Sequence, residues 1–282
     1  MVESRLSGGY RGLLPEVVAV RPPHPRLTGH VMAYIGLDLR LSSPLRRRSV
    51  ASATPMLMMD FEVAGRRISR LDGTTGVASV PSPVSGVLDT PVDVELSGHQ
   101  FGVGVCLTPP GVFALLDLPL HELANTPVRL GDILGQHREQ RLVDRLASVP
   151  RWSDRFHLLD RLLPALLAAG PAPSEAVLHA WRRLNAASGR TTIAALADDV
   201  GVRRRRLETL FREQVGATPK ALARILRFHR AFRLLTDGTG STGLAAVAAA
   251  CGYSDQAHLT REVRALSGST PRGLRSGHHQ AE

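Results

Sequence analysis

Cysteine and lysine are almost missing from this chain of 282 residues, and so are the usual signs of a membrane protein or a metalloprotein. The two cysteines, Cys106 and Cys251, fall in different halves of the chain, so we expect two buried free thiols and no disulfide. The eleven histidines have no spacing typical of zinc ligands. There is no apolar run of about 18 residues and no signal-peptide pattern. We therefore expect a soluble, cytoplasmic protein with no membrane partner, no metal and no cofactor.

Motifs of catalysis are absent as well. The sequence contains no Gly-x-Ser-x-Gly elbow, no phosphate-binding loop and no His-Glu-x-x-His. Carboxylates are scattered over strand-like segments, where they usually only face solvent: Asp38, Asp60, Glu62, Asp93 and Glu95. The prediction is that the protein is not an enzyme, with a catalytic N-terminal part as the alternative.

Positive charge is concentrated toward the C-terminus. Residues 174–282 carry 17 basic and 9 acidic side chains, a net charge of +8, whereas residues 1–173 carry 18 and 16, a net charge of +2. All of the 35 basic residues except Lys220 are arginine. A polyanionic partner is the natural inference, because each neutralised phosphate releases condensed counterions. A merely soluble basic surface would explain the charge equally well by itself.

An internal repeat decides between these explanations. Residues 193–222 recur, in changed form, at 244–274: IAALADDVGV and LETLFREQVGATPKAL correspond to LAAVAAACGY and LTREVRALSGSTPRGL. Equivalent residues lie 51 apart at Gly201 and Gly252, and 52 apart after the turn that follows. The two copies therefore differ by one residue inserted in a turn.

Each copy has the pattern of a helix-turn-helix. The first helix is short and rich in alanine, and it ends at a glycine that can adopt the left-handed conformation without a steric penalty. The second helix of the first copy places Leu207, Leu210 and Phe211 on one face, which we expect to be buried. A Thr-Pro pair at 218–219, and again at 270–271, then supplies an N-cap hydroxyl and a first-turn proline for the next helix.

These features resemble the AraC/XylS family of transcriptional regulators, whose DNA-binding region holds two such motifs joined by one helix. The second copy, AAACGYSDQAHLTREVRALSGSTPRGLR from Ala248, is similar to the family signature at its Gly-aromatic-Ser turn, its Asp-Gln start and its Gly-x-Thr-Pro exit. The resemblance covers residues 174–276. Arg203 stands where the family usually has a capping Ser, and Val263 where it usually has Phe, so we expect a less well capped first recognition helix and a less well packed second one.

Both the helical spacing and the family resemblance indicate which side chains reach DNA. Positions 205, 208, 209 and 212 share the face opposite the apolar one, and the 52-residue offset gives the matching positions of the second copy. Arginine and glutamine pair with guanine and adenine edges. Contact with phosphate alone is the alternative for Arg203, Arg204, Arg206 and Arg212. The predicted DNA-binding residues are Arg203, Arg204, Arg205, Glu208, Thr209, Arg212, Gln256, Ala257, His258, Thr260, Arg261 and Arg264.

A single helix over 219–235 is predicted to join the motifs. Its 17 residues span roughly 25 Å at about 1.5 Å per residue, and together with the widths of the motifs this can bridge two major-groove faces about 34 Å apart. The apolar positions expected to pack against the motifs are Leu222, Ile225, Leu226, Phe228 and Leu234. Three arginines, Arg224, Arg227 and Arg230, face either phosphate or solvent, and the sequence does not decide their orientation.

The N-terminal part changes character along its length. Segments 17–20, 30–39, 55–63, 92–98 and 101–107 are short, rich in branched residues and typical of strands. Helical spacing follows, over 112–123, 132–149 and 153–169, with an interruption or kink expected at Pro164. The fold class is therefore an α+β N-terminal domain followed by an all-α C-terminal domain with two helix-turn-helix motifs joined by a linker helix.

The stretch 101–135 also resembles the N-terminal domain of a subset of AraC-like regulators, which implies sensing or assembly. We divide the chain into 1–173, an effector-binding or dimerisation domain, 174–276, the DNA-binding domain, and 277–282, a polar tail. The cluster Met56, Met58 and Met59 either lines a pocket or belongs to the core. Five leucines either form a dimer seam or pack on the domain's own sheet: Leu158, Leu159, Leu162, Leu163 and Leu166.

The function expected from the sequence is sequence-specific regulation of transcription, with two recognition helices in successive major grooves. The expected partners are double-stranded DNA and RNA polymerase. A small-molecule effector and a second copy of the chain are the alternatives for the partner of the N-terminal domain.

Overall fold

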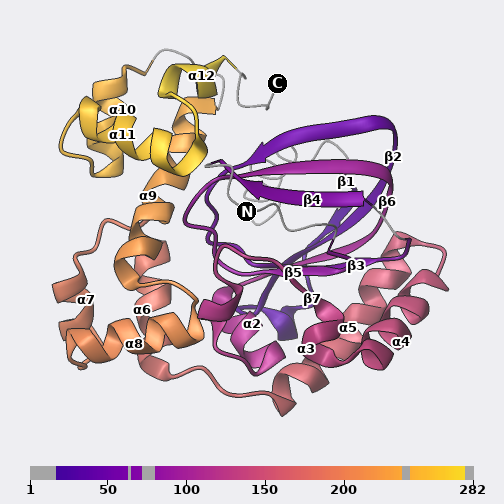
Figure 1. Cartoon of the computed structure of the whole chain (residues 1–282). Coiled ribbons are helices and arrows are strands. Elements are labelled where there is room, and N and C mark those ends of the chain that lie inside the picture. Colours follow the sequence, from indigo (N-terminus) through magenta and orange to yellow (C-terminus); the bar gives the residue numbers. More distant parts are fainter. Residues whose placement is uncertain (1–16, 63–64, 72–79, 237–241, 277–282) are drawn as a thin grey trace.

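The computed structural model describes residues 17–62, 65–71, 80–236 and 242–276. A β-rich N-terminal part is flanked by helices, and a helical C-terminal part lies along one side of it (Figure 1). The predicted fold class is confirmed.

Seven strands of the described residues form one antiparallel sheet, in the order β1-β2-β6-β3-β5-β7, with β4 paired to β6. The strands are β1 (Val17–Arg21), β2 (Val31–Ser49), β3 (Met56–Asp60), β4 (Gly65–Arg70), β5 (Pro83–Ser85), β6 (Val92–Leu107) and β7 (Val128–Arg129). The strands expected near 17–20, 30–39 and 55–63 are confirmed, whereas β4, β5 and β7 were not foreseen.

The two strands predicted at 92–98 and 101–107 are a single strand, β6. It bends at Gly98, whose φ of 72° is left-handed, and the register against β2 shifts opposite this residue. On one side of Gly98 β6 pairs with β4, and on the other it pairs with β3. The glycine that suggested a break thus marks an exchange of partners within a continuous strand.

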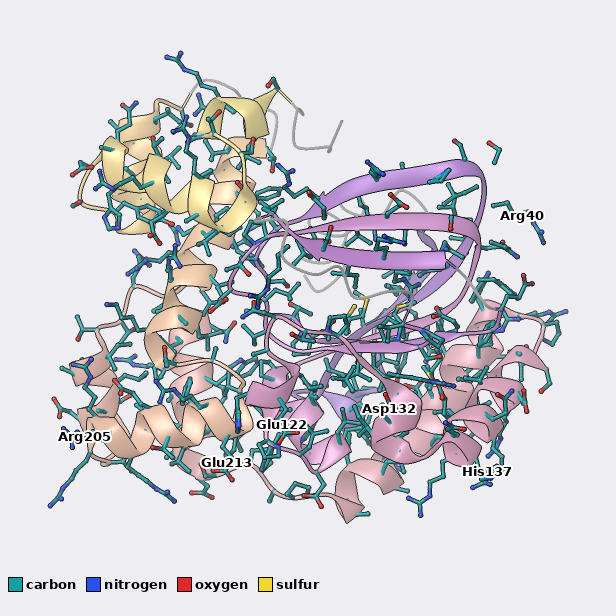
Figure 2. The ribbon with its side chains drawn as sticks, viewed as in Figure 1. Arg40, Glu122, Asp132, His137, Arg205 and Glu213 are labelled. Atoms are coloured by element: carbon teal, nitrogen blue, oxygen red, sulfur yellow. The ribbon has the colours of Figure 1, made fainter. Side chains whose placement is uncertain are left out.

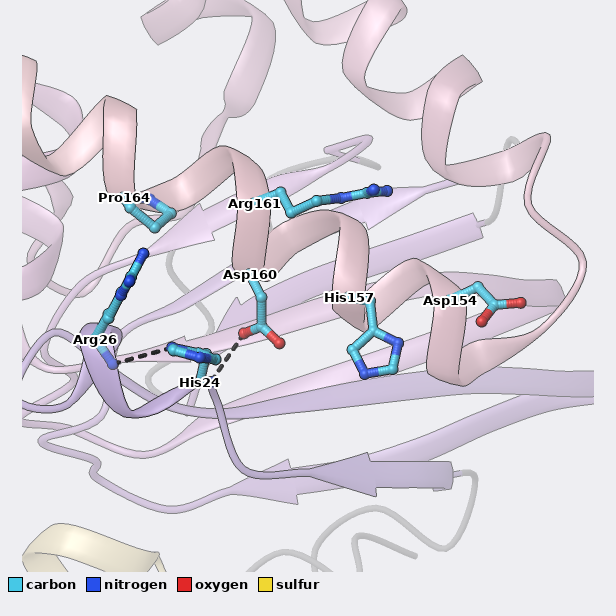
Figure 3. Close-up of a pocket in the computed structure, with 7 residues that line it drawn as sticks. All are labelled: His24, Arg26, Asp154, His157, Asp160, Arg161 and Pro164. Carbon is cyan, nitrogen blue, oxygen red and sulfur yellow. Dashed lines mark hydrogen bonds between the residues drawn. The ribbon is translucent and has the colours of Figure 1, made fainter.

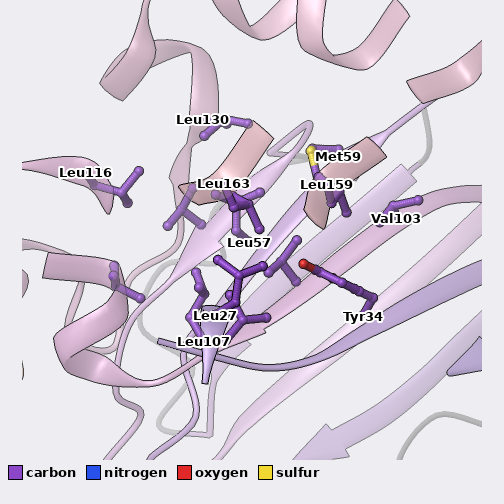
Figure 4. Close-up of a cluster of buried hydrophobic side chains, with 14 of the residues drawn as sticks. Leu27, Tyr34, Leu57, Met59, Val103, Leu107, Leu116, Leu130, Leu159 and Leu163 are labelled. Atoms are coloured by element: carbon purple, nitrogen blue, oxygen red, sulfur yellow. The ribbon is translucent and has the colours of Figure 1, made fainter. Parts of the chain in front are cut away.

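Helices cover one face of the sheet and enclose the largest core (Figure 4). They are η1 (Pro25–Leu27), α2 (Pro109–Leu116), η2 (Leu120–Leu123), α3 (Leu130–Leu134), α4 (Gln136–Ala147) and α5 (Trp152–Ala169). Gly36 of β2 permits the close approach of α5, because a Cβ there would lie 2.6 Å from a ring carbon of Trp152. Helix α5 continues through Pro164 without interruption.

This core settles two of the alternatives left by the sequence. Met59 belongs to this core and Met58 is buried too. Met56 is half-buried against a smaller cluster, so the methionines are core residues. Leu158, Leu159 and Leu163 are buried there too, and only Leu166 of that group is exposed. The leucines of α5 pack mainly against their own sheet.

The C-terminal part contains the two predicted motifs. Its helices are α6 (Glu175–Ala186), α7 (Ile193–Asp199), α8 (Arg204–Gln214), α9 (Pro219–Thr236), α10 (Leu244–Cys251), α11 (Gln256–Ser267) and α12 (Pro271–Arg275). Helices α7 and α8 form the first motif and α10 and α11 the second, with α8 and α11 near opposite ends of α9 (Figure 1). The proposed boundary at 173 falls in the loop between α5 and α6, and it stays a prediction.

The linker helix agrees with the expected one to within a residue at its end. Leu222, Ile225 and Phe228 are fully buried as expected, and Leu226 is partly buried. The prediction for Leu234 was wrong, since this side chain is 41% exposed. The buried stripe continues from Phe228 through Ala231 to Leu235, and Leu234 lies about 100° away from it around the helix.

Candidate nucleic-acid interface

The ends of the two motifs match the predictions. Gly201 and Gly252, which follow the first helices, have left-handed φ angles of 67° and 77°. The hydroxyl of Thr218 accepts a hydrogen bond from the amide of Ala221 at 3.1 Å, and that of Thr270 from the amide of Gly273 at 3.0 Å. These caps fix the residue at which the helix after each recognition helix begins.

The two recognition helices begin differently. Arg203 occupies the N-cap position of α8 and its side chain makes no capping hydrogen bond. Asp255 caps α11, accepting from the amide of His258 at 2.6 Å, and this bond and that from Ser254 lower the pKa of Asp255. The predicted weaker cap of α8 is confirmed. Val263 is fully buried, and the looser packing expected around it stays a prediction.

The face of α8 opposite its buried residues is exposed and basic. Arg205, Thr209 and Arg212 are exposed, and Figure 2 shows Arg205 pointing away from the rest of the molecule. Glu208 is half-buried, and its Oε1 lies 2.9 Å from Nε of Arg204. Because Arg204 and Glu208 pair with each other, Arg205 and Arg212 are the arginines of this face with the greatest freedom to meet an anion.

The corresponding face of α11 carries Gln256, Ala257, Arg261 and Arg264, all exposed. Thr260 is half-buried, and its hydroxyl donates to the carbonyl oxygen of Gln256 at 2.9 Å. Two long arginines, an amide and two small side chains therefore share one surface of the helix. This combination can read base edges and thymine methyl groups.

His258 differs from its neighbours. Its Nδ1 lies 3.2 Å from the hydroxyl oxygen of Ser254, and its ring meets that of Tyr253 edge to face at 5.2 Å. The histidine therefore stabilises the turn before α11. The His258 side chain is only half-buried, so the edge of the ring that carries Nε2 can still meet a ligand.

The sequence left the orientation of three linker arginines open, between phosphate and solvent. Nε of Arg224 lies 2.6 Å from Oε2 of Glu262, Arg227 lies over the ring of Tyr253 at 5.8 Å, and Arg230 lies close enough to Cys251 to oppose part of the rise in the pKa of that thiol. All three groups they contact belong to the second motif. The arginines hold α9 against α10, α11 and the turn between them, an arrangement that sequence periodicity could not reveal.

Sequence reasoning also missed Arg190. This exposed residue precedes α7, and its Cγ lies 3.3 Å from where a Cβ on Gly252 would be placed. A basic side chain of the first motif therefore covers the turn of the second. Its position in a loop gave no periodic signal.

The N-terminal part contains a hollow of about 790 Å³ on the outer side of α5 and η1 (Figure 3), lined by His24, Arg26, Asp154, His157, Asp160, Arg161 and Pro164. The carboxylate of Asp160 already has partners within the protein. It pairs with Arg21 and accepts hydrogen bonds from the hydroxyl of Tyr34 and the amide of His24, both at 2.9 Å. Burial, and then Asp160, raise the pKa of Tyr34. The remaining lining holds two arginines, two histidines, one carboxylate and a proline.

Both cysteines are buried thiols outside any disulfide, as predicted, and burial raises the pKa of Cys251. Within the part of the chain that the structure describes, no three His, Cys, Asp or Glu side chains gather as a metal site would require. His278 and His279 lie outside the described residues. Across the described ranges, no helix combines the length and apolarity needed to cross a membrane.

Paired helix-turn-helix motifs with exposed basic recognition helices define a DNA-binding protein, and comparison with known proteins agrees. Residues 196–277 match a family described as a helix-turn-helix domain, and residues 19–129 match a domain of unknown function, DUF6597. No curated protein matches the chain.

Solved structures extend the comparison. A probable AraC family transcriptional regulator from Rhodopseudomonas palustris CGA009 is 31% identical, with 36% of this chain and 96% of that chain covered and a TM-score of 0.34. A transcriptional regulator with an AraC-type DNA-binding domain from Chromobacterium violaceum is 31% identical, with 36% and 89% covered and a TM-score of 0.33. Apo ToxT K231A from Vibrio cholerae strain SCE256 is 12% identical, with 91% and 99% covered and a TM-score of 0.45.

The chain belongs to the AraC family of transcriptional regulators. It is a DNA-binding regulator of transcription.

Proposed function

We propose that this protein regulates transcription by binding a specific DNA sequence, with α8 and α11 inserted into successive major grooves. One observation carries the proposal: two recognition helices with exposed basic faces lie near opposite ends of one linker helix. The 18 residues of α9 span about 27 Å, and the widths of the motifs add the rest of a groove repeat of about 34 Å.

The recognition helices α8 and α11 would make different contacts with DNA. On α11, Gln256, Arg261 and Arg264 would read base edges, with Ala257 and Thr260 against thymine methyl groups. On α8, Arg205 and Arg212 would contact bases or phosphates from the face that also holds Thr209. Arg203, at the uncapped start of α8, is well placed for phosphate, because the free amides there also favour an anion.

The N-terminal domain would modulate this activity by binding a small effector or by dimerisation, and RNA polymerase would be the partner at the promoter. The hollow beside α5 offers one place for an anionic effector, since Arg26 and Arg161 line it together with His157. Contacts between the N-terminal part and both motifs, described below, provide a physical route for such an effect.

The test is selection of binding sites from random duplex DNA by the full-length chain. Affinity for the selected operator is then compared with affinity for a scrambled duplex of equal length over a salt series. Specific binding typically exceeds non-specific binding by roughly 10³-fold or more, and equal affinities at every salt concentration would refute sequence-specific binding.

The regulatory role is tested separately by deleting the N-terminal domain. We expect operator affinity, oligomeric state or output from a reporter promoter to change. A monomeric full-length chain whose affinity and transcription output are both unchanged by the deletion would refute modulation by that domain.

A further inference from the structure

A short segment of the N-terminal part, Val50–Ala53, is inserted into the DNA-binding part. Ala51 is fully buried. Its amide donates to the carbonyl oxygen of Leu266 on α11 at 2.8 Å, and its carbonyl oxygen lies 2.7 Å from Nε2 of His229 on α9. One residue thus joins the linker helix and the second recognition helix through its backbone.

The same segment is hydrogen-bonded to the loop between β5 and β6 of the N-terminal part. The amide of Ser52 donates to the carbonyl oxygen of Leu88 at 2.7 Å, and the amide of Leu88 donates back at 2.8 Å. The residue next to Ala51 in the chain is therefore fixed to the N-terminal part, so Ala51 cannot follow α11 unless the loop that holds Leu88 moves too.

Side-chain packing extends the contact to both motifs. Val50, Ala51 and Val87 belong to the buried cluster formed by α9, α10, α11 and α12. Ala53 packs against that cluster and also against the separate cluster of α6, α7, α8 and α9. The segment consequently fills space between the hydrophobic cores of the two motifs.

The ends of the two recognition helices meet the N-terminal part at equivalent positions of the repeat. Gly216 follows α8, and a Cβ on it would lie 2.7 Å from the carbonyl oxygen of Leu120 in η2. Gly268 follows α11, and a Cβ on it would lie 2.7 Å from Cδ1 of Leu71 and 3.1 Å from Cδ of Arg48. The N-terminal part therefore contacts the chain just after the C-terminal end of each recognition helix.

From these contacts we propose that the segment Val50–Ala53 is a positioning element, which fixes the distance and angle between α8 and α11 and so selects the spacing of half-sites in the operator. The inference rests on the proposed function, since it assumes that both helices enter DNA. Residues outside the helix-turn-helix motifs then contribute to specificity without touching a base.

Changing the half-site spacing by one base pair is a sensitive test, because DNA geometry couples distance to rotation. Inserting or deleting one base pair between the half-sites turns one of them by about 35° relative to the other. It also shifts that half-site by about 3.4 Å along the duplex axis. A rigidly held pair of helices cannot follow both changes, whereas a pair joined by α9 alone can bend and twist to meet them.

The experiment measures the affinity of full-length variants for the selected operator and for operators with one base pair added or removed. His229→Leu removes the donor to Ala51, and Ala51→Leu overfills the fully buried position. His229→Gln keeps a side-chain N–H, so it should restore the wild-type behaviour. His179→Leu is the matched control, because His179 lies on α6 and pairs with Asp199, away from the segment.

We expect the wild type, His179→Leu and His229→Gln to lose about tenfold or more in affinity on the altered spacings, as for a mismatched contact. His229→Leu and Ala51→Leu should lose affinity on the selected operator and discriminate less between spacings. Folded variants with the wild-type ratio of affinities across spacings would overturn the inference alone. If the wild type does not distinguish operator from scrambled DNA, both the proposed function and this inference are contradicted.

Hydrogen exchange on the wild type decides the matter if a variant fails to fold. The amide of Ala51 is expected to stay protected in the operator complex at least as strongly as in the free protein, because the segment must remain seated while α8 and α11 bind. Faster exchange of a peptide covering residues 48–55 in the complex would show that the segment leaves on DNA binding, and would contradict the positioning role.

Discussion

Nε2 of His229 lies 2.7 Å from the carbonyl oxygen of Ala51, and this hydrogen bond connects the linker helix of the DNA-binding part to the segment that follows β2 in the N-terminal part. Burial, with a further contribution from Arg233, lowers the pKa of His229 below its ordinary value, although the bond to Ala51 opposes this in part. The ring is therefore neutral at pH 7 and donates its single N–H across the contact.

Stability should consequently depend on this histidine below about pH 6.5, the ordinary pKa. Between that value and the lowered pKa of the folded state, the unfolded chain binds a proton that the folded chain does not, so stability is full above pH 6.5 and falls as the pH drops. Thermal unfolding of the wild type and of His229→Gln at pH 8 and pH 5.5 measures this. The wild type should lose more Tm than the variant, and equal losses would contradict the lowered pKa.

Arg261 and Arg212 are expected to differ in kind. If Arg261 reads a base, Arg261→Ala should cost roughly 1–3 kcal/mol on the operator and relax discrimination at one base pair. Arg212→Ala, as a phosphate contact, should weaken binding to all sequences alike and lower the salt slope by about one. Affinities for operator and scrambled DNA over a salt series separate the two. Equal losses of Arg261→Ala on both DNAs would show that it contacts only the backbone, leaving specificity to Gln256, His258 or the first helix.

Supplying the missing cap of α8 should stabilise the protein and weaken its grip on DNA. Arg203→Ser provides a side-chain acceptor for the free amides of the first turn, an effect typically worth about 1 kcal/mol. It also removes a cation from the proposed phosphate contact, so affinity should fall equally for operator and scrambled duplex. Chemical denaturation and DNA titration of the same preparation provide both numbers, with Arg203→Ala as a control that loses the charge without gaining the cap. A lower stability of Arg203→Ser than of Arg203→Ala would contradict the capping role.

The fragment 174–276 should fold and bind DNA without the N-terminal domain, because it contains α6, both motifs and the linker helix. The fragment lacks Val50, Ala51 and Val87, which complete the core of the second motif. Its Tm should therefore be lower than that of the full-length chain, and it should discriminate less between operators of different half-site spacing. Circular dichroism and retardation of operator DNA test this. A soluble, helical fragment with no affinity for the operator would contradict it.

The sequence by itself determined the architecture of the DNA-binding part. Helix ends there depend on local chemistry: a left-handed glycine at Gly201 or Gly252, and the hydroxyls of Thr218 and Thr270 as caps, act within a few residues of the chain. The buried face of α8 follows from helical periodicity alone. These interactions are short-range, so a single sequence with an internal repeat was enough to specify them.

Only the tertiary structure decided what depends on residues far apart in the chain. The bend of β6 at Gly98 requires β4 and β3 to pair on either side of it, and Arg224, Arg227 and Arg230 face inward because Glu262, Tyr253 and Cys251 of the second motif lie against α9. The seating of Ala51 between His229 and Leu266 joins segments separated by about two-thirds of the chain. On the N-terminal side these hydrogen bonds use only the backbone of Ala51, which leaves no periodicity and needs no particular side chain there. The sequence therefore carries no sign of the contact that ties the N-terminal part to the linker helix and α11.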